Sequence, residues 1–239
     1  MAYSIHETGR PNSLEHRIYL SRGSSLLSPW HEVPLYTEQR GIVNMIVTVP
    51  RWTHQSMTIA KDEFLTPLRP DTHKGELRYV PNIFPHRGYP WTYGALPQTF
   101  EDPNVEDQIS RLPGDNEPLD VIDLAGDGDV GHTGQVREVK VLGAIGVIGF
   151  SETDWKIVAI DTRSELAERM QEIEDVETHM PGFLGTIKEW FRVYPLAEGG
   201  CTNQDVFRGE LELAKGKAFA SMLIERSHQS WNKIETKTR

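Results

Sequence analysis

The sequence predicts an α+β protein that is mainly β, with helices confined to the last third of the chain. Three stretches are rich in β-branched and apolar residues, as strands are: 41–50 (GIVNMIVTVP), 136–150 (VREVKVLGAIGVIGF) and 154–161 (DWKIVAID). Residues 79–104 hold many proline, glycine and asparagine residues, which are typical of loops. Helical spacing of apolar residues begins only after residue 162. This order favours an antiparallel β-barrel or curled sheet with helices packed on its outside.

Three helices are expected in the last third. The first should begin at Thr162, whose spacing to Glu165 matches a capping box. Its apolar residues recur at helical spacing: Leu166, Met170, Ile173 and Val176. Pro181 breaks this helix, and a second helix is expected over 182–193. A third is expected over about 209–232. Its buried face is predicted to hold Leu211, Ala214, Ala218 and Met222.

Length and composition favour a single globular domain over 1–239, since 38% of the residues are hydrophobic and 25% are charged. The net charge of -10 argues against nucleic-acid and anionic-membrane partners and suits metal cations. No stretch of 18 apolar residues is present, and the polar first residues lack the apolar core of a signal peptide. The single cysteine, Cys201, excludes an internal disulfide and favours a reducing, intracellular setting.

Acidic residues are concentrated in 114–134 (GDNEPLDVIDLAGDGDVGHTG). Asp115 and Glu117 would share one face of an extended strand, roughly 6.6 Å apart, and Pro118 would let Asp120 turn back toward them. Converging carboxylates repel one another unless a cation lies between them, and oxygen-only ligands suit Mg²⁺ or Mn²⁺. The alternative is that they are solvated turn charges. The remaining acidic residues are predicted to be turn or surface charges: Asp123, Asp127 and Asp129.

A second polar cluster lies at 151–156, where Asp154 and Lys156 alternate and so face one side of a strand. They could form an ordinary ion pair, or a metal ligand beside a phosphate-binding lysine. Other polar side chains could hold phosphate oxygens or could simply lie at the surface or the edge of the core: Arg78, Tyr89 and Tyr93.

Several segments occur together in a fixed order: VPLY (33–36), PRWT (50–53), FPHRGY (84–89), YGALPQTFEDP (93–103), GDNEPLDV (114–121), TGQV (133–136), ETDWK (152–156) and EWFRVY (189–194). In these segments the chain resembles the family I soluble inorganic pyrophosphatases of the eukaryotic type. The resemblance implies an OB-like, closed five-stranded β-barrel with flanking helices. It also implies Mg²⁺ as cofactor, hydrolysis of diphosphate in the cytoplasm, and a homodimer with Arg51, Trp52 and His86 at its interface.

Site roles follow from the same resemblance. The carboxylates implied to hold the first metal are Asp115, Asp120 and Asp154, and Asp120 would also touch a second metal. The side chains implied to contact phosphate are Arg78, Tyr93, Lys156 and Tyr194. Tyr89 would lie near the nucleophilic water, and Glu117 stands where the family has the aspartate that activates this water. The catalytic residues expected on this basis are Glu117, Tyr89, Arg78 and Lys156.

The chain departs from the family at several site positions. Neutral residues replace carboxylates or lysines at Thr48, Ser56, Thr58, Gly149 and Pro195. Glu117 is one methylene longer than the family aspartate, and a misplacement of about 1 Å can cost about 100-fold in rate. The lost charges and the displaced base predict weak hydrolysis of inorganic diphosphate. A wider, less charged pocket suits a bulkier organic diphosphate, such as a prenyl diphosphate.

Two other functions remain open from the sequence. The chain could be an inactive paralogue that binds a partner, for example a normal pyrophosphatase subunit. It could instead be a metal-assisted lyase or cyclase that expels a diphosphate group without water as nucleophile. For Glu117 alone, the alternative is a conservative replacement that keeps the function of a general base.

Overall fold

The structure is a computed structural model that describes residues 2–126, 130–148, 152–197 and 214–238. Sequence predictions made for Asp127, Asp129, Gly149, Cys201 and Leu211 fall outside these ranges.

The centre of the molecule is a closed ring of five strands: β4 (Ile42–Val49), β9 (Thr92–Ala95), β10 (Asp120–Asp123), β11 (Val136–Ile148) and β12 (Thr153–Asp161). They are ordered β12-β10-β9-β4-β11, and pairing of β11 with β12 closes the ring. All of these pairs are antiparallel except β10 with β12. A short strand, β13 (Ala214–Gly216), adds to β11. The expected closed five-stranded barrel is therefore confirmed, and β4, β11 and β12 match the three apolar stretches of the sequence.

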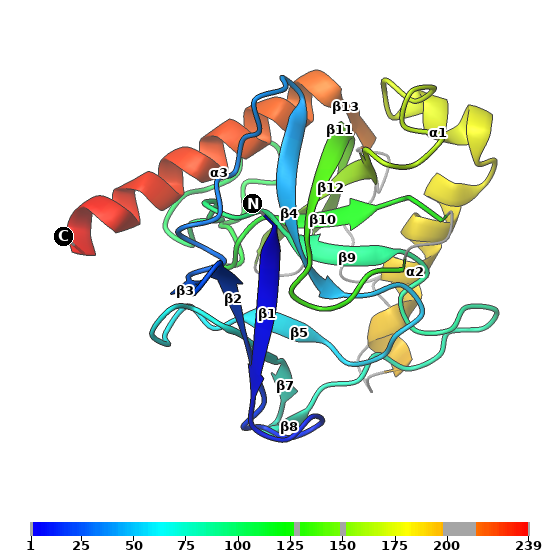
Figure 1. Ribbon diagram of the computed structural model, residues 1–239. Helices are drawn as coiled ribbons and strands as arrows, with labels where there is room; N and C mark the ends of the chain where they lie inside the picture. Colours follow the sequence, from blue (N-terminus) through cyan, green and yellow to red (C-terminus); the bar gives the residue numbers. More distant parts are fainter. Residues whose placement is uncertain (1, 127–129, 149–151, 198–213, 239) are drawn as a thin grey trace.

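A second antiparallel sheet lies beside the barrel and contains β1 (Tyr3–Thr8), β2 (Arg17–Arg22), β3 (Ser25–Leu27), β5 (Met57–Ile59) and β6 (Leu68–Pro70). A small hairpin of β7 (Thr72–His73) and β8 (Glu76–Leu77) follows it. Figure 1 shows β1, β2 and β5 below the barrel strands, with the hairpin at the lower edge. The loop between this sheet and β9 carries several of the predicted site residues.

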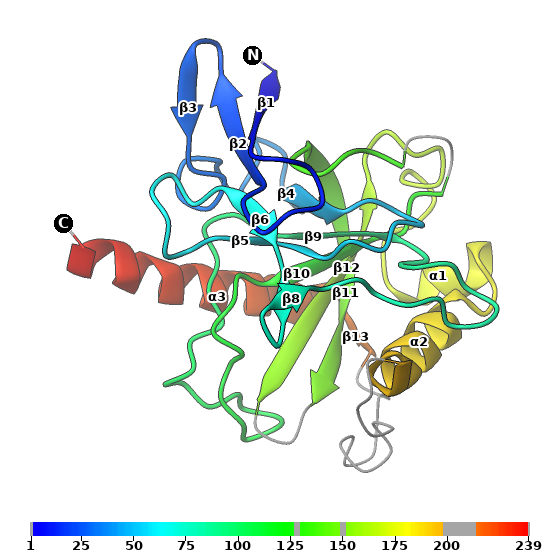
Figure 2. The same ribbon diagram turned by 90° about the horizontal axis from the view of Figure 1, so that it is seen from below.

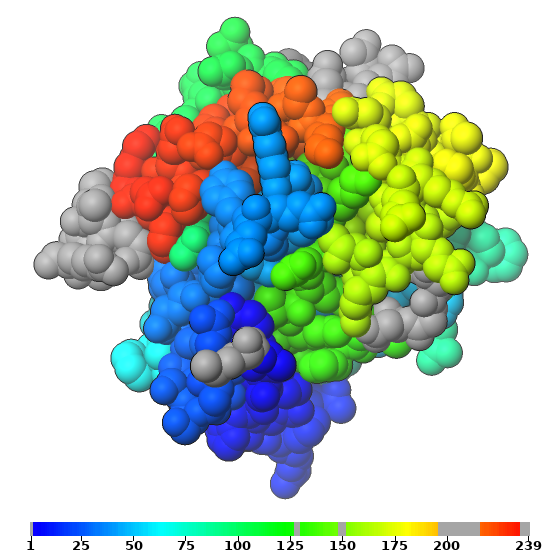
Figure 3. Space-filling view, turned by 45° about the horizontal axis from the view of Figure 1, so that its top comes forward, coloured from blue at the N-terminus to red at the C-terminus, as the bar shows by residue number. Residues whose placement is uncertain are grey.

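The helices cover opposite sides of the barrel: α1 (Glu174–His179) and α2 (Phe183–Ala197) on one side, and α3 (Lys217–Thr238) on the other, as Figures 1 and 2 both show. Trp190 and Ile187 of α2 are buried against one group of barrel residues, and Leu223 and Ile224 of α3 against another. Figure 3 shows the orange start of α3 next to the light-blue segment that leads into β4. Among the described residues, no helix is long and apolar enough to cross a bilayer.

The helix predicted to begin at Thr162 is wrong for most of its length, because only 174–179 is helical. Residues 162–173 form successive turns held by bonds between residues three apart, such as Ser164 N–H to Asp161 O and Ala167 N–H to Ser164 O. The buried positions are still those of the pattern: Met170, Ile173 and Val176. Consecutive turns can therefore bury one apolar face as a helix does. The second predicted helix is confirmed as α2.

The predicted buried face of the third helix is also wrong, because Ala218 is exposed and Met222 is 49% exposed. The helix begins at Lys217, directly after β13, and the docking of β13 on β11 sets its rotation. The face that packs on the protein instead holds Ala220, Leu223, Ile224, Ser227 and Trp231. The prediction treated 209–232 as one continuous helix, and it therefore placed the buried face on the wrong residues.

Asp123 is not a turn or surface charge, as the sequence predicted, but is fully buried in β10. One of its carboxylate oxygens lies 2.8 Å from Nη1 of Arg137, and the other accepts the N–H groups of Ala125 and Asp161. A buried charge is tolerated when it is paired and hydrogen-bonded in this way. The barrel thus has a buried ion pair at the C-terminal end of β10.

Candidate active site

A single cavity of about 210 Å³ brings together every side chain that the sequence predicted for the site. These side chains come from the loop before β9, from β9 and β10, from the loop before β10, from β12 and from α2. They are Arg78, Tyr89, Tyr93, Asp115, Glu117, Asp120, Asp154, Lys156 and Tyr194. Segments as far apart in the chain as those of Arg78 and Tyr194 therefore form one polar cavity.

The loop that carries Asp115 and Glu117 is a tight turn, not the extended strand that the sequence suggested. Asn116 has a φ of 68°, and the N–H of Glu117 donates to Oδ1 of Asp115 at 2.9 Å. Asparagine tolerates this left-handed conformation better than most residues do. Two backbone bonds to Glu101 hold the loop from behind: Glu101 N–H to Glu117 O, and Asn116 N–H to Glu101 O, both 2.9 Å.

Lys156 lies between two of the predicted metal ligands. The pairing of β10 with β12 places it opposite Asp120, and its Nζ lies 2.5 Å from Oδ2 of Asp120. It also forms an ion pair with Asp154, two residues away on β12. The hydroxyl of Tyr93 donates to the same Oδ2 of Asp120 at 2.5 Å. Burial lowers the pKa of Lys156, but the two carboxylates outweigh burial and raise this pKa well above its usual range. The ion pair expected from the sequence is present.

Three carboxylates form a second cluster, in which Asp115 and Asp154 line this cavity and Glu101 lines a smaller cavity. Oxygens of Glu101, Asp115 and Asp154 all lie within 4.8 Å of one another. Burial, and then repulsion by Asp154, raises the pKa of Asp115 to about 8. Burial raises the pKa of Asp154 to about 6 despite the neighbouring Lys156. Two oxygens of the cluster, Oδ1 of Asp154 and Oε2 of Glu101, are buried without a hydrogen-bond donor among the described residues.

This carboxylate cluster fits a hard divalent cation. Mg²⁺ and Mn²⁺ prefer carboxylate oxygens, and the cluster offers oxygens only. A cation would also satisfy the buried oxygens that lack a donor, which otherwise cost free energy. Sequence reasoning missed Glu101, because it lies in the segment YGALPQTFEDP with no acidic spacing to mark it.

Two further charged residues that the sequence did not indicate hold predicted site residues. Nζ of Lys61 lies 2.9 Å from Oε1 of Glu117, and Nη1 of Arg78 lies 2.9 Å from Oδ2 of Asp71. Burial raises the pKa of Glu117, and the hydrogen bond from Lys61 opposes this rise. Both partners are distant from the segments whose charge pattern was informative, so only the fold reveals them.

Aromatic rings form the side of the cavity toward α2. The ring of Tyr89 lies 4.8 Å from that of Trp190, which stacks on Tyr194 at 5.1 Å. Tyr89 is buried, and burial raises the pKa of its hydroxyl above the usual range. The hydroxyl of Tyr89 therefore stays protonated at neutral pH and can donate a hydrogen bond to an anion.

Three of the positions at which the sequence predicted a departure from the family line the same cavity. Thr48 on β4, Ser56 just before β5, and Thr58 on β5 all line it. Pro195 lies inside α2 and is not among the described lining residues. The side chains at these three positions bring hydroxyl groups and no charge to the cavity.

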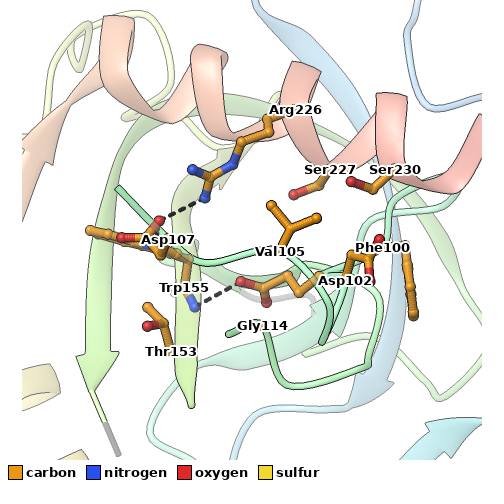
Figure 4. A pocket seen from close by; sticks show the side chains of 11 residues that line it. Phe100, Asp102, Val105, Asp107, Gly114, Thr153, Trp155, Arg226, Ser227 and Ser230 are labelled. Carbon is orange, nitrogen blue, oxygen red and sulfur yellow. Dashed lines mark hydrogen bonds and ion pairs between the residues drawn. The ribbon is translucent and has the colours of Figure 1, made fainter. Parts of the chain in front are cut away.

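Figure 4 shows a second cavity, of about 30 Å³, on the side of Trp155 toward α3. Asp107 accepts hydrogen bonds there from Nε1 of Trp155 at 3.1 Å and from Nη2 of Arg226 at 2.7 Å. The backbone N–H of Trp155 donates to Oε1 of Glu101 at 3.3 Å. These bonds connect α3, through Asp107 and Trp155, to Glu101 of the carboxylate cluster.

Comparison with known proteins identifies the family. The profile of the family described as inorganic pyrophosphatase matches residues 45–232. The inorganic pyrophosphatase of Emericella nidulans is 46% identical over 98% of this chain and 80% of its own length. That of Neurospora crassa is 44% identical over 98% of this chain and 79% of its own length. The chain therefore belongs to the inorganic pyrophosphatase family, whose enzymes are hydrolases that act on phosphoric anhydrides.

Solved structures agree with this assignment. The inorganic pyrophosphatase of Schistosoma japonicum superimposes with a TM-score of 0.91 at 41% identity, over 97% of this chain and 80% of that one. An N-terminally truncated vacuolar soluble pyrophosphatase of Trypanosoma cruzi, in complex with PPi, gives a TM-score of 0.87 at 32% identity, over 98% of this chain and 91% of that one. The fold predicted from the resemblance is confirmed.

Proposed function

We propose that the protein is a Mg²⁺-dependent phosphohydrolase that acts on an organic diphosphate, such as a prenyl diphosphate, and hydrolyses inorganic diphosphate slowly. One observation carries the proposal. A retained set of carboxylates, lysine and tyrosines shares one cavity with neutral side chains at Thr48, Ser56 and Thr58. The retained set supports phosphoric anhydride chemistry, and the neutral side supports a substrate with less charge.

The proposed metal ligands are Asp115, Asp120 and Asp154, and Mn²⁺ could take the place of Mg²⁺. A bound divalent cation supplies a Lewis acid that lowers the pKa of a coordinated water and offsets phosphate charge. Lys156 now pairs with Asp120 and Asp154, so a metal would compete with it for these oxygens, and a phosphate would compete with the carboxylates for Lys156. Lys156 would then be free to bind a phosphate oxygen, as the sequence suggests.

The other residues would bind substrate and move the proton. Charge-assisted hydrogen bonds from Arg78 and Lys156, together with the hydroxyls of Tyr93 and Tyr194, would hold the phosphate oxygens. Glu117 would take the proton of the attacking water, with Tyr89 beside that water. Burial raises the pKa of Glu117 from its ordinary value toward neutral pH, which suits a general base.

The proposal extends to assembly and location. We expect a homodimer that uses Arg51, Trp52 and His86, in the cytoplasm. Trp52 is 48% exposed, and the guanidinium of Arg51 lies 4.4 Å from the centre of its ring. A half-exposed tryptophan beside an arginine is typical of the centre of a protein interface.

Phosphate release from a panel of diphosphates, measured with Mg²⁺, Mn²⁺ or Co²⁺, tests the proposal. Asp154→Asn, prepared in parallel, controls for contaminating phosphatases. The proposal expects release by the wild-type protein that depends on the metal and is lost in the variant. No release from any substrate with any metal would overturn it and would favour an inactive binding protein. A cyclised or eliminated product, in place of the simple alcohol or monophosphate, would favour a lyase.

A further inference from the structure

Glu101 lies directly behind the proposed metal ligands, in the loop after β9. Glu101 is 8% exposed, yet its carboxylate forms no ion pair with an arginine, lysine or histidine in the described part of the chain. A carboxylate oxygen of Glu101 lies within 4.8 Å of carboxylate oxygens of Asp115 and Asp154. The three groups come from separate segments, so the fold alone brings them together.

The hydrogen bonds of Glu101 leave one of its oxygens without a donor. Oε1 accepts the backbone N–H of Trp155 at 3.3 Å, whereas Oε2 is buried and has no hydrogen-bond partner among the described residues. Oδ1 of Asp154, in the same cluster, is in the same situation. Leaving a buried acceptor of this kind unsatisfied costs free energy, and more when it is charged. Two such oxygens in one cluster point to a ligand that satisfies both.

The charges of the cluster point to a cation. Lys156 forms its ion pairs with Asp120 and Asp154, and in the described residues neither Glu101 nor Asp115 has an ion pair. The backbone bonds of Glu101 to Glu117 and Asn116 hold its loop against the loop that carries Asp115. A divalent cation between these carboxylates would compensate the charge that Lys156 does not.

We infer that Glu101 is a further ligand of the cation that Asp115 and Asp154 hold, and that it binds this cation from the buried side of the cavity. This inference rests on the metal site of the proposed function. It predicts a site with more protein carboxylates than the set of Asp115, Asp120 and Asp154. Additional charged oxygen ligands raise affinity for a hard cation.

Direct binding of Mn²⁺ alone, without substrate, tests the inference by following the signal of free Mn²⁺ in electron paramagnetic resonance. Glu101→Gln keeps the shape of the side chain and its acceptor for Trp155 but removes the charge. We expect its Mn²⁺ affinity to fall by about tenfold or more. Asp102→Asn is the matched control, because it removes one charge from the neighbouring residue, whose Oδ1 is engaged with Asn104. This control should bind Mn²⁺ as the wild type does.

A Glu101→Gln variant that folds, as judged by circular dichroism, and binds Mn²⁺ like the wild type would overturn the inference while leaving the proposed function intact. Failure of the wild type itself to bind Mn²⁺ at millimolar concentration would overturn both. Wild-type crystals soaked in Mn²⁺ give an answer that does not depend on folding of the variant. An anomalous peak about 2–2.5 Å from an oxygen of Glu101 supports the inference. A peak held by Asp115 and Asp154 with Glu101 out of reach contradicts it.

Discussion

Nζ of Lys61 lies 2.9 Å from Oε1 of Glu117 and also donates to the backbone oxygen of Asn116. The proposed base is therefore held by a lysine that the charge pattern of the sequence gave no reason to select. The lysine side chain is 19% exposed and that of Glu117 is 43% exposed. The contact pairs the carboxylate of Glu117 with a cation and opposes the rise of its pKa.

Lys61→Met should move the acid limb of the pH–rate profile to higher pH. Burial raises the pKa of Glu117 and the bond from Lys61 lowers it, so its removal leaves burial unopposed. A base must be unprotonated to act, so activity below the new pKa falls. The measurement is kcat/KM against pH on the best substrate of the panel. Lys74→Met, an exposed lysine between β7 and β8, is the control and should leave the profile unchanged. If the Lys61→Met profile matches the wild type, Lys61 does not act on the base.

Metal-free protein should lose stability as the pH rises. The pKa of Asp115 is raised to about 8 and that of Asp154 to about 6, from unfolded values of about 3.9. The folded state therefore binds more protons than the unfolded state between these values, and stability decreases from about pH 4 to pH 8. Bound Mg²⁺ should cancel this decrease in stability, because the cation takes the place of the protons on Asp115 and Asp154.

Thermal unfolding between pH 5 and pH 8.5, with chelator or with saturating Mg²⁺, measures this effect. We expect Tm to fall with pH in chelator and to stay nearly constant in Mg²⁺. The same slope in both conditions would show that these carboxylates do not hold a metal.

Asp123→Asn and Asp120→Asn should differ, although both residues lie on β10. Asp123 is the buried partner of Arg137, and removal of one member of a buried pair costs about 3 kcal/mol. We expect urea unfolding to show that loss for Asp123→Asn, with Mn²⁺ affinity unchanged. Asp120→Asn should instead weaken Mn²⁺ binding with a smaller effect on stability. Glu189→Gln, which breaks an exposed pair with Arg192, should change neither quantity. Equal loss of metal affinity in both β10 variants would contradict the division of roles.

The barrel could be predicted from the sequence because its long strands are continuous apolar, β-branched segments. Strands β4 and β12 are buried along nearly their whole length. Such continuous apolar segments can be predicted as strands from their own residues, without knowledge of the strands they pair with. The rotation of α3 could not be predicted, because it depends on how β13 docks against β11. The turns at 162–173 carry a helical apolar pattern, so periodicity alone gave the wrong structure there.

Motifs in the sequence indicated the candidate site residues. They did not indicate the residues that contact and hold those candidates. Asp115, Asp120 and Asp154 stand in segments dense in acidic residues, which drew attention to them. Glu101 and Lys61 act through contacts with Asp115 and Glu117, to which no sequence spacing connects them. The burial of Asp123 likewise depends on Arg137, fourteen positions further along the chain.

The most direct test compares kcat/KM for an organic diphosphate and for inorganic diphosphate, in the wild type and in a combined Ser56→Lys, Thr58→Glu and Glu117→Asp variant. These changes place two charges and a shorter acidic side chain at positions that line the cavity. The account predicts that the wild type prefers the organic substrate and that the variant gains at least about tenfold on inorganic diphosphate. A wild type that prefers inorganic diphosphate, with a ratio that the variant leaves unchanged, would contradict it.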